Sequence, residues 1–258
     1  MKRRDFLAAS ALATAAVART DAPALGQLAA ENRSLIEWRT YRLKEAAQQE
    51  RVHEHLEKAF IPSLERFFRA PVGVFTEIGP DAGPSIHVLL HYHSSFLLKQ
   101  SEYLYADMTY QNAAKSYLST SKDDPAFERI ESSLMLAFEG APEVTPPARG
   151  PRVFEVRTYE SHSEERALKK IAMFNLLEIP IFGRCGFEPV FFGQTLIGAG
   201  LPNLRYMLAA RDMAANEAAW KTFVDHPDWL RIRDLPEYRD TVSKIHKLFL
   251  EPTVYSQI

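Results

Sequence analysis

The sequence predicts an α+β fold built from two tandem βαββαβ domains of the ferredoxin-like type. The first observation behind this prediction is an internal repeat: EWRTY at residues 37–41 returns as EVRTY at residues 155–159, a shift of 118 residues. The same shift aligns two further landmarks, Ile61-Pro62 with Ile179-Pro180 and Pro84-Ser85-Ile86 with Pro202-Asn203-Leu204. Three landmarks at one spacing indicate a duplication. The second observation is that both halves show the same order of strand and helix patterns.

The first half follows the order strand, helix, strand, strand, helix, strand. Apolar residues alternate in the strand stretches and recur at helical spacing between them. Pro62 interrupts the first helical pattern, which predicts a kink or a second helix that begins with proline. Residues 79–84 are rich in glycine and proline and predict a turn. The expected strands are 35–43, 72–78, 86–93 and 134–138, and the expected helical stretches are 52–67 and 95–119.

The second half repeats this order. Ser161 and Glu164 suit a capping box that opens its first helix, and Asp212 is placed to cap the second helix. The expected strands are 153–159, 187–196, 204–211 and 241–250. A proline-rich linker, residues 140–151, separates a first domain at 25–139 from a second at 152–258. Because each four-stranded sheet carries helices on one face only, we expect the two sheets to cover each other face to face.

Residues 1–24 have the features of an export signal. Arg3-Arg4 are followed by Phe6-Leu7 and an alanine-rich apolar run, and small residues at 16–18 and 22–24 fit a cleavage site. The paired arginines resemble the twin-arginine motif. The apolar run is much shorter than the roughly 20 residues that span a bilayer. We therefore expect a periplasmic or otherwise exported protein, sent through the twin-arginine pathway and without stable membrane insertion after cleavage.

The composition is that of a globular protein, with 46% hydrophobic and 25% charged residues. The net charge is −2 and no basic stripe stands out, so nucleic acid is not an expected partner. Cys185 is the only cysteine, which excludes an internal disulfide and a cysteine-based metal site. The sequence contains no Gly-rich phosphate loop, nucleophile elbow or His-Glu-x-x-His pattern. No cofactor or metal site is identified from these motifs.

Several segments of the second half resemble the NIPSNAP family, within the dimeric α/β-barrel superfamily. They are residues 155–159, Ile179-Pro180, residues 204–208, and residues 220–223 followed by 225–229. The resemblance covers most of the second half, whereas the first half is a looser copy. It implies that the two sheets face each other as an α/β barrel. It implies no reaction, because the family has no single established one, and the wider superfamily includes small monooxygenases acting on quinols or haem, haem enzymes, and binding or structural proteins.

Alternate residues of a strand share one face, so the predicted strands present polar sets. Glu37, Arg39 and Tyr41 form one set, and Glu155, Arg157 and Tyr159 form the equivalent set. His87, His91 and His93 share a face opposite Val88, Leu90 and Tyr92, and the repeat places Arg205 against the histidine face. We expect all these polar faces to look into the space between the sheets, where they would line a small-molecule pocket.

Two interpretations of these sets stay open. The Glu/Arg/Tyr set occurs in both halves, which favours an ion-pair ladder that fixes the sheets over an active site. The three histidines occur only in the first half, as an asymmetric functional site would, although histidine on a sheet face is commonly a hydrogen-bonded core residue. The candidate catalytic residues are His91 and His93, and the candidate ligand-binding residues are His87, Arg39, Tyr41, Arg157, Tyr159 and Arg205.

Three functions therefore stay open, and whether the protein is an enzyme stays open with them. In the first, a small hydrophobic or aromatic molecule is bound or oxidised between the sheets; His91 or His93 would take its proton, and an arginine (Arg39, Arg157 or Arg205) would stabilise the anion. The second is a non-catalytic interaction or scaffold protein, with a filled interior and satisfied Glu–Arg pairs. The third is a haem-binding protein. Free sheet edges also predict homo-oligomers.

Overall fold

The computed structural model describes residues 32–92 and 96–258. The predicted export signal, residues 1–24, and the candidate residue His93 lie outside the described residues.

The described part of the first half has the expected order of elements. Strand β1 leads into a long helix, strands β2 and β3 form a hairpin, and a second helical stretch leads to β4. The elements are β1 (Leu35–Arg42), α2 (Ala46–His55), η1 (Leu56–Phe60), α3 (Ile61–Phe67), β2 (Gly73–Glu77), β3 (Ile86–Tyr92), α4 (Phe96–Ala106), α5 (Met108–Ala113), α6 (Lys115–Leu118) and β4 (Arg129–Ala137). Strand β4 begins five residues earlier than predicted. Residues 129–133 are mostly polar and exposed and gave no apolar alternation, yet they pair with residues 38–42 of β1.

The second half repeats the first. Strand β5 and helix α7 stand 118 residues after β1 and α2 at both of their ends. The elements are β5 (Val153–Glu160), α7 (Glu164–Met173), η2 (Phe174–Glu178), α8 (Ile179–Arg184), β6 (Glu188–Ile197), β7 (Asn203–Ala210), α9 (Met213–Val224), α10 (Pro227–Ile232), η3 (Pro236–Tyr238) and β8 (Lys244–Pro252). This agreement confirms the tandem repeat of βαββαβ units.

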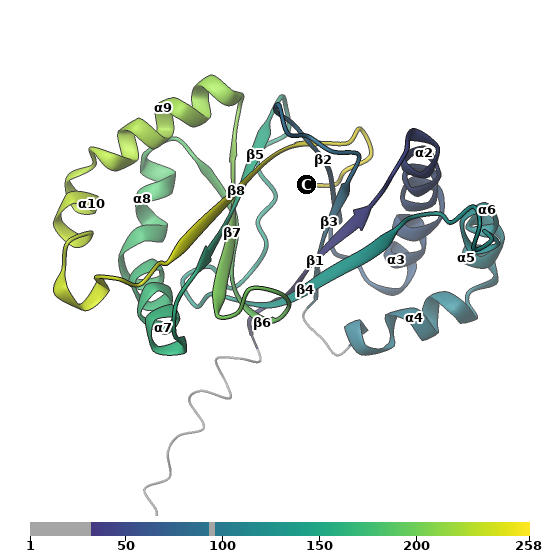
Figure 1. Ribbon diagram of the computed structural model, residues 1–258, viewed down its shortest axis with the longest axis horizontal. Helices are drawn as coiled ribbons and strands as arrows, with labels where there is room; N and C mark the ends of the chain where they lie inside the picture. The colour runs from purple at the N-terminus through teal and green to yellow at the C-terminus, as the bar shows by residue number, and fades with distance from the viewer. Residues whose placement is uncertain (1–31, 93–95) are drawn as a thin grey trace, which may run out of the picture.

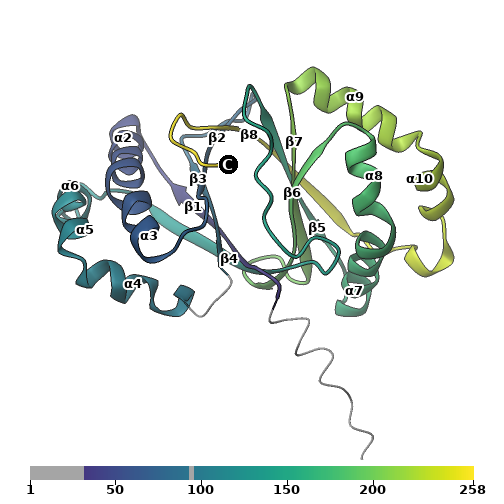
Figure 2. The ribbon, with the colours of Figure 1, turned by 180° about the vertical axis from the view of Figure 1, so that it is seen from behind.

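The eight strands form one closed antiparallel barrel in the order β1-β3-β2-β8-β5-β7-β6-β4. Each half contributes four neighbouring strands, and the two seams are the pairs β2–β8 and β4–β6. Figure 1 shows α2 to α6 on one side of the barrel and α7 to α10 on the opposite side, and the reverse view in Figure 2 agrees. The predicted face-to-face sheets are thus confirmed as a barrel. Because the seams use the outer strands of both halves, the free edges that suggested homo-oligomers are paired, and oligomerisation stays a prediction.

A π-helical turn stands at the equivalent place in both halves, at η1 and η2, directly before Ile61-Pro62 and Ile179-Pro180. Proline lacks an N–H and its ring clashes with the carbonyl four residues earlier, so a regular α-helix cannot continue through it. The wider turn accommodates the proline, and α3 and α8 each start with it in their first two positions. The predicted interruption is confirmed and takes this form.

Side-chain oxygens cap two helices of the second half, α7 and α9. Asp212 Oδ1 accepts a hydrogen bond from the Ala215 N–H, which confirms the predicted cap. The predicted capping box at Ser161 is wrong. Ser163 caps α7 by accepting from the Arg166 N–H, while the Ser161 hydroxyl donates to the carbonyl oxygen of Thr241.

Three apolar clusters stabilise the fold. In each half, one cluster lies between the sheet and its helices. The third cluster fills the middle of the barrel. The linker contributes Val144 to the barrel cluster, so the segment between the halves is packed against the sheet. The predicted bounds of the two domains stay predictions. Among the described helices, none has the length and apolar character needed to cross a membrane.

Candidate functional site

The barrel register decides which side chains face the interior. His87 on β3 stands opposite Thr40 on β1, and Val88 stands opposite Arg39. Directly opposite residues of neighbouring strands point to the same side of a sheet. Arg39 therefore shares the helix-facing side with Val88, while Thr40 shares the interior with His87. The expectation that both polar sets line the barrel is wrong for the Glu/Arg/Tyr set and confirmed for His87.

In the first half the Glu/Arg set forms a buried network under the helices. Arg39 Nε donates to Glu37 Oε1 at 2.9 Å, and an Arg39 amino group donates to Gln100 at 3.3 Å. The second oxygen of Glu37 accepts from the Tyr92 hydroxyl at 3.3 Å. The Ser132 hydroxyl donates to Glu37 at 2.8 Å. Tyr41 is buried in the apolar cluster beneath the same helices.

The second half contains the same pair with different partners. Arg157 Nε donates to Glu155 Oε1 at 2.6 Å, and its guanidinium carbon lies 3.4 Å from the centre of the Trp220 ring. Asn216 and the Trp220 indole N–H donate to the other oxygen of Glu155. The Tyr159 hydroxyl shares a hydrogen bond with Tyr206 at 2.8 Å. Each carboxylate has several donors, which is the structural role that recurrence in both halves favours.

A cavity of about 570 Å³ opens at one mouth of the barrel, within the usual size range of ligand pockets. We call it the mouth pocket. Its lining comes from β1, β3, β4, β5, β7 and β8 and from the loop between β6 and β7: Trp38, Thr40, Arg42, His87, Glu131, Ser132, Ser133, Val156, Thr158, Glu160, Gly198, Ala199, Gly200, Arg205, His246, Lys247 and Leu248. Two residues predicted for the site, His87 and Arg205, thus meet in one pocket.

His87 is held by hydrogen bonds at both ring nitrogens. Its Nε2 lies 2.8 Å from Glu77 Oε1 on β2, and its Nδ1 lies 3.0 Å from the Thr40 hydroxyl. The hydrogen bond with His87 is the largest influence that lowers the pKa of Glu77, and the Gly83 N–H adds to it. Trp38 stacks on the imidazole with ring centres 5.5 Å apart. The ring is therefore fixed in position and orientation.

Arg205 enters the same pocket from the second half. Its Nε donates to the Thr158 hydroxyl at 3.0 Å, and its guanidinium carbon lies 5.8 Å from the centre of the Trp38 ring. Burial lowers the pKa of Arg205 to about 10. In the described ranges, 32–92 and 96–258, no carboxylate forms an ion pair with this guanidinium. A partly buried cation without a counterion is unfavourable unless an anion joins it.

His87 and Arg205 occupy equivalent positions in the two halves. The 118-residue shift relates His87 to Arg205 and Thr40 to Thr158. Each basic side chain bonds to its own threonine hydroxyl at 3.0 Å. The arrangement is therefore duplicated in geometry and different in chemistry.

Most other charges around the mouth pocket are paired. Arg42 bonds to Glu131 at 2.8 Å, and His246 bonds to Glu160 at 2.7 Å. Lys247 and Arg205 are without a carboxylate partner in the part of the chain that the structure describes. The unpaired charge of the pocket is consequently positive, and its complement is an anionic group beside an apolar surface.

The remaining predicted residues do not line this pocket. His91 stands opposite Ile36 on β1. It is four residues from His87 on the same face of β3, a separation of roughly 13 Å along the strand. Arg39, Tyr41, Arg157 and Tyr159 lie between sheet and helices. Of the two predicted histidines that the structure describes, His87 and His91, it is His87 that lines the mouth pocket with Arg205.

Neither haem nor a metal ion fits the mouth pocket through His87. Both ring nitrogens already bond to Glu77 and Thr40, so neither nitrogen is available to a metal. The centre of the barrel is packed with aromatic and aliphatic side chains such as Phe75, Phe154 and Phe191, where a porphyrin has no room. Within the described residues, no group of three histidine, cysteine or acidic side chains is placed to hold a metal ion.

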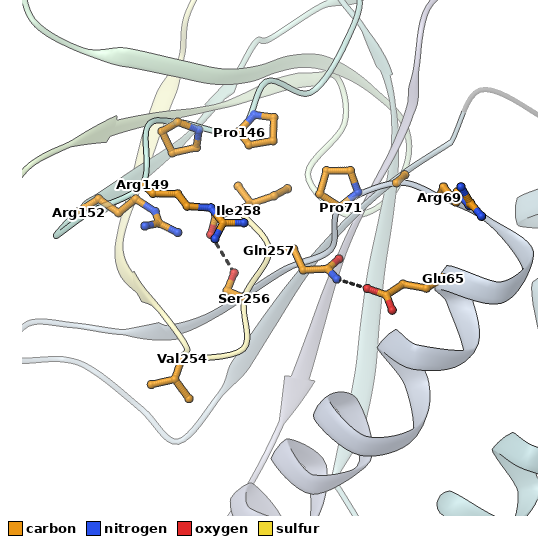
Figure 3. Close-up of a pocket in the computed structure, with 12 residues that line it drawn as sticks. Glu65, Arg69, Pro71, Pro146, Arg149, Arg152, Val254, Ser256, Gln257 and Ile258 are labelled. Atoms are coloured by element: carbon orange, nitrogen blue, oxygen red, sulfur yellow. Dashed lines mark hydrogen bonds between the residues drawn. The ribbon is translucent and has the colours of Figure 1, made fainter.

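A second cavity, of about 960 Å³, lies between the linker and the C-terminal segment. Figure 3 shows Arg149 of the linker and Arg152, just after it, close together at one end and Arg69 at the other. The Ile258 side chain next to it is 1% exposed and belongs to the barrel cluster. The segment after β8 therefore packs against this end of the barrel interior, and the cavity is an outer cleft. The mouth pocket, with side chains from inside the barrel, is the stronger candidate site.

Comparison with known proteins agrees with this architecture. Residues 154–257 match the NIPSNAP family model. This part of the chain is similar to a NIPSNAP domain. The matched segment covers β5 to β8 with their helices and supplies Val156, Thr158 and Arg205 to the mouth pocket. The predicted resemblance is therefore confirmed for the second half. A search of curated proteins found no match to the chain.

Solved structures with the same arrangement cover both halves. A candidate monooxygenase from Fusobacterium nucleatum matches with a TM-score of 0.57 and 8% identity, over 85% of this chain and 92% of that one. A candidate monooxygenase from Lactobacillus acidophilus NCFM matches with a TM-score of 0.57 and 9% identity, over 85% and 94%. A NIPSNAP-like domain protein from Burkholderia xenovorans covers 42% of this chain and 90% of its own, with 16% identity and a TM-score of 0.37. The first two similarities establish the dimeric α/β-barrel fold.

Sequence reasoning missed several residues of the mouth pocket, namely Trp38, Thr40, Thr158 and the nearby Glu77. The signal was present in the alternation of β1, where Trp38 and Thr40 occupy the face opposite Glu37 and Arg39. The prediction places the polar face of β1 inside the barrel and therefore names no residue of the opposite face. Glu77 gave no local signal, since only the pairing of β2 with β3 brings it to His87.

Proposed function

We propose that the protein binds a small aromatic molecule with an acidic or anionic group in the mouth pocket. The observation that carries this proposal is the Arg205 guanidinium, which lies beside the Trp38 ring without a carboxylate partner among the described residues. A planar acid would place its anionic oxygen against Arg205 and its ring along Trp38. Val156 and Leu248 extend the apolar part of the lining.

The charge of the pocket supports an anion over a neutral molecule. Burial alone lowers the pKa of Arg205, so the guanidinium lacks the stabilisation that a bound anion would provide. Hydrogen bonds between a guanidinium and a carboxylate contribute about 1.5–3 kcal/mol. That range corresponds to roughly 10- to 100-fold in affinity.

The test compares 3-nitrobenzoate with the neutral 3-nitrobenzamide, using isothermal titration calorimetry on the wild type and on Arg205→Gln. We expect the wild type to prefer the benzoate, and Arg205→Gln to weaken benzoate binding about 10- to 100-fold with little effect on the amide. Arg211→Gln is the matched control, because Arg211 directly follows β7 but is exposed and paired with Asp212. Equal affinities for the two probes in the wild type would refute the proposal.

Oxidation of the bound molecule is the second candidate function. The observation that favours it is His87, a fixed imidazole in the same pocket as Arg205. We place His87 in the base role that the sequence suggested for His91 or His93. The two structures of similar fold are described as candidate monooxygenases. A quinol is a suitable first substrate, because the resemblance found in the sequence includes monooxygenases acting on quinols. Dioxygen uptake with a hydroquinone that falls in His87→Gln but not in His91→Gln would support this role, and equal uptake in both variants would exclude it.

The scaffold alternative is weakened in one respect. It predicted a filled barrel with satisfied Glu–Arg pairs and no open pocket. The pairs are satisfied and the barrel centre is filled, yet the mouth is open by about 570 Å³. We also propose export through the twin-arginine pathway and assembly into homo-oligomers. Both proposals rest on the sequence alone.

A further inference from the structure

A hydrogen-bonded chain of three residues leads from the mouth pocket to a carboxylate behind it. Thr40 lines the pocket, its hydroxyl contacts His87 Nδ1 at 3.0 Å, and His87 Nε2 contacts Glu77 at 2.8 Å. We propose that this chain takes the proton of an acidic aromatic hydroxyl, so that the ligand is a phenol or enol held as its anion. The inference rests on the proposed function and names the chemical class of its ligand.

Glu77 fixes the direction of transfer. An ionised carboxylate only accepts hydrogen bonds, and the hydrogen bond with His87 keeps the pKa of Glu77 low. His87 therefore carries its proton on Nε2 and presents the lone pair of Nδ1 to Thr40. In this tautomer the Thr40 hydroxyl donates to Nδ1, and its oxygen can accept a hydrogen bond from a ligand in the pocket. Glu77 is a positioning residue, because it acts through His87.

The transfer conserves protons and charge. The O–H bond of the ligand breaks, its proton passes to the Thr40 oxygen, and the proton of Thr40 passes to His87 Nδ1. The products are an aromatic oxyanion in the pocket and an imidazolium between Thr40 and Glu77. Nothing is oxidised or reduced. Arg205, whose guanidinium carbon lies 5.8 Å from the centre of the Trp38 ring, then has an anion as its partner.

The other charged groups around this chain allow the step. Arg42 on β1 acts on Glu77 as a nearby positive charge and helps to keep it ionised. The acidic residues of the lining, Glu131 and Glu160, are paired with Arg42 and His246. Lys247 adds a positive charge to the rim. The field at the ligand is consequently positive, which stabilises an oxyanion.

The experiment uses two probes of similar size, 3-nitrophenol and 3-nitrobenzoate. The benzoate is already an anion and has no proton to give, whereas the phenol is ionisable and its phenolate absorbs at a longer wavelength. Binding is measured by absorbance at a pH about one unit below the pKa of the free phenol, where roughly a tenth is ionised. Titration calorimetry in two buffers with different heats of ionisation counts the protons released.

We expect the wild type to bind 3-nitrophenol as the phenolate with no net release of protons, because the proton stays on His87. Phenolate binding with one proton released would overturn the inference, since Arg205 alone would then account for ionisation. Binding of the neutral phenol would overturn it as well. If neither probe binds, the proposed function itself fails, and this result is distinct because 3-nitrobenzoate tests that function alone.

Two variants separate the chain from general packing. Thr40→Val keeps the shape of the side chain and removes the hydroxyl. The phenolate absorbance of the bound ligand should then fall about tenfold, or binding should release a proton to the buffer. Glu77→Gln removes the charge that favours the imidazolium and should give the same loss. Thr222→Val, at an exposed threonine on α9, is the matched control and should behave as wild type. Thermal unfolding of each variant verifies the fold, and phenolate binding without proton release in Thr40→Val would overturn the inference.

Discussion

The guanidinium carbon of Arg205 lies 5.8 Å from the centre of the Trp38 ring. Arg205 comes from β7 in the second half and Trp38 from β1 in the first, so the contact joins the two halves across the barrel interior. Trp38 also stacks on His87 at 5.5 Å. One aromatic ring therefore touches both basic residues, and any ligand between them must pack along it.

Replacing Trp38 with leucine should weaken binding of 3-nitrobenzoate about 3- to 10-fold, because stacking on an aromatic ring contributes roughly 0.5–1.5 kcal/mol. Titration calorimetry measures this change. Trp229→Phe is the control, since Trp229 packs against Phe223 in the helical cluster of the second half. Unchanged affinity in Trp38→Leu would show that the ligand does not use this ring.

Glu155 should matter for stability more than for binding. It is 1% exposed and accepts hydrogen bonds from Arg157, Asn216 and Trp220. Glu155→Gln leaves the Arg157 charge buried without a counterion, and we expect a loss of roughly 3 kcal/mol in the free energy of unfolding by urea. Replacing both Glu155 and Arg157 with methionine should recover much of that loss. Glu165→Gln, at an exposed pair with Lys169, should leave the unfolding midpoint in place.

We expect His55 to destabilise the folded protein as the pH falls from about 6.5 towards 3. The ring is buried and stacked on Tyr117 at 3.7 Å, and burial, together with the charge of Arg39, lowers its pKa from 6.5 to about 3. The unfolded chain therefore binds this proton first as the pH falls. The contribution of neutral His55 is complete above about pH 6.5 and is lost progressively towards pH 3, at about 1.4 kcal/mol per pH unit.

The measurement is a series of urea unfolding curves between pH 7 and pH 4. His55→Phe should reduce the slope of unfolding free energy against pH by up to one proton, whereas His162→Asn, at an exposed histidine, should keep the wild-type slope. The same slope in His55→Phe and wild type would contradict the assignment.

The predicted export through the twin-arginine pathway should depend on the paired arginines near the start of the sequence. Replacing Arg3 and Arg4 with lysine should retain the protein in the cytoplasm, because the twin-arginine pathway reads both guanidinium groups. Cell fractionation followed by immunoblotting measures the distribution. Arg33→Lys is the control outside the signal. Normal export of the double variant would favour the general secretory route.

The fold was predictable because both of its signals can be read directly from the sequence. The repeat at a 118-residue shift and the alternating strands identified both βαββαβ units, and Pro62 and Pro180 marked the helix interruption. The barrel seams were not predictable in detail. Pairing of β2 with β8 and of β4 with β6 depends on shape over the whole molecule, and the polar start of β4 hid five of its residues from the alternation.

The site was only half predictable. His87 and Arg205 were identified from their strand faces. Glu37 and Arg39 were predicted on the wrong side, because the apolar face of a strand was expected to pack on the helices and the polar face to line the barrel. Here the helices cover that side and the pair satisfies itself with Ser132, Gln100 and Tyr92. The partner of His87 on β2 and the location of the pocket at one mouth needed the three-dimensional arrangement.

The fusion of the two halves into one chain has a chemical consequence. A barrel assembled from two identical chains carries the same side chain at both positions related by its two-fold axis, either two histidines or two arginines. A single chain escapes that restriction, and here one copy of the position is an ionisable ring and the other a permanent cation. The mouth pocket can therefore contain both a group that accepts a proton, His87, and a cation that pairs with the resulting anion, Arg205.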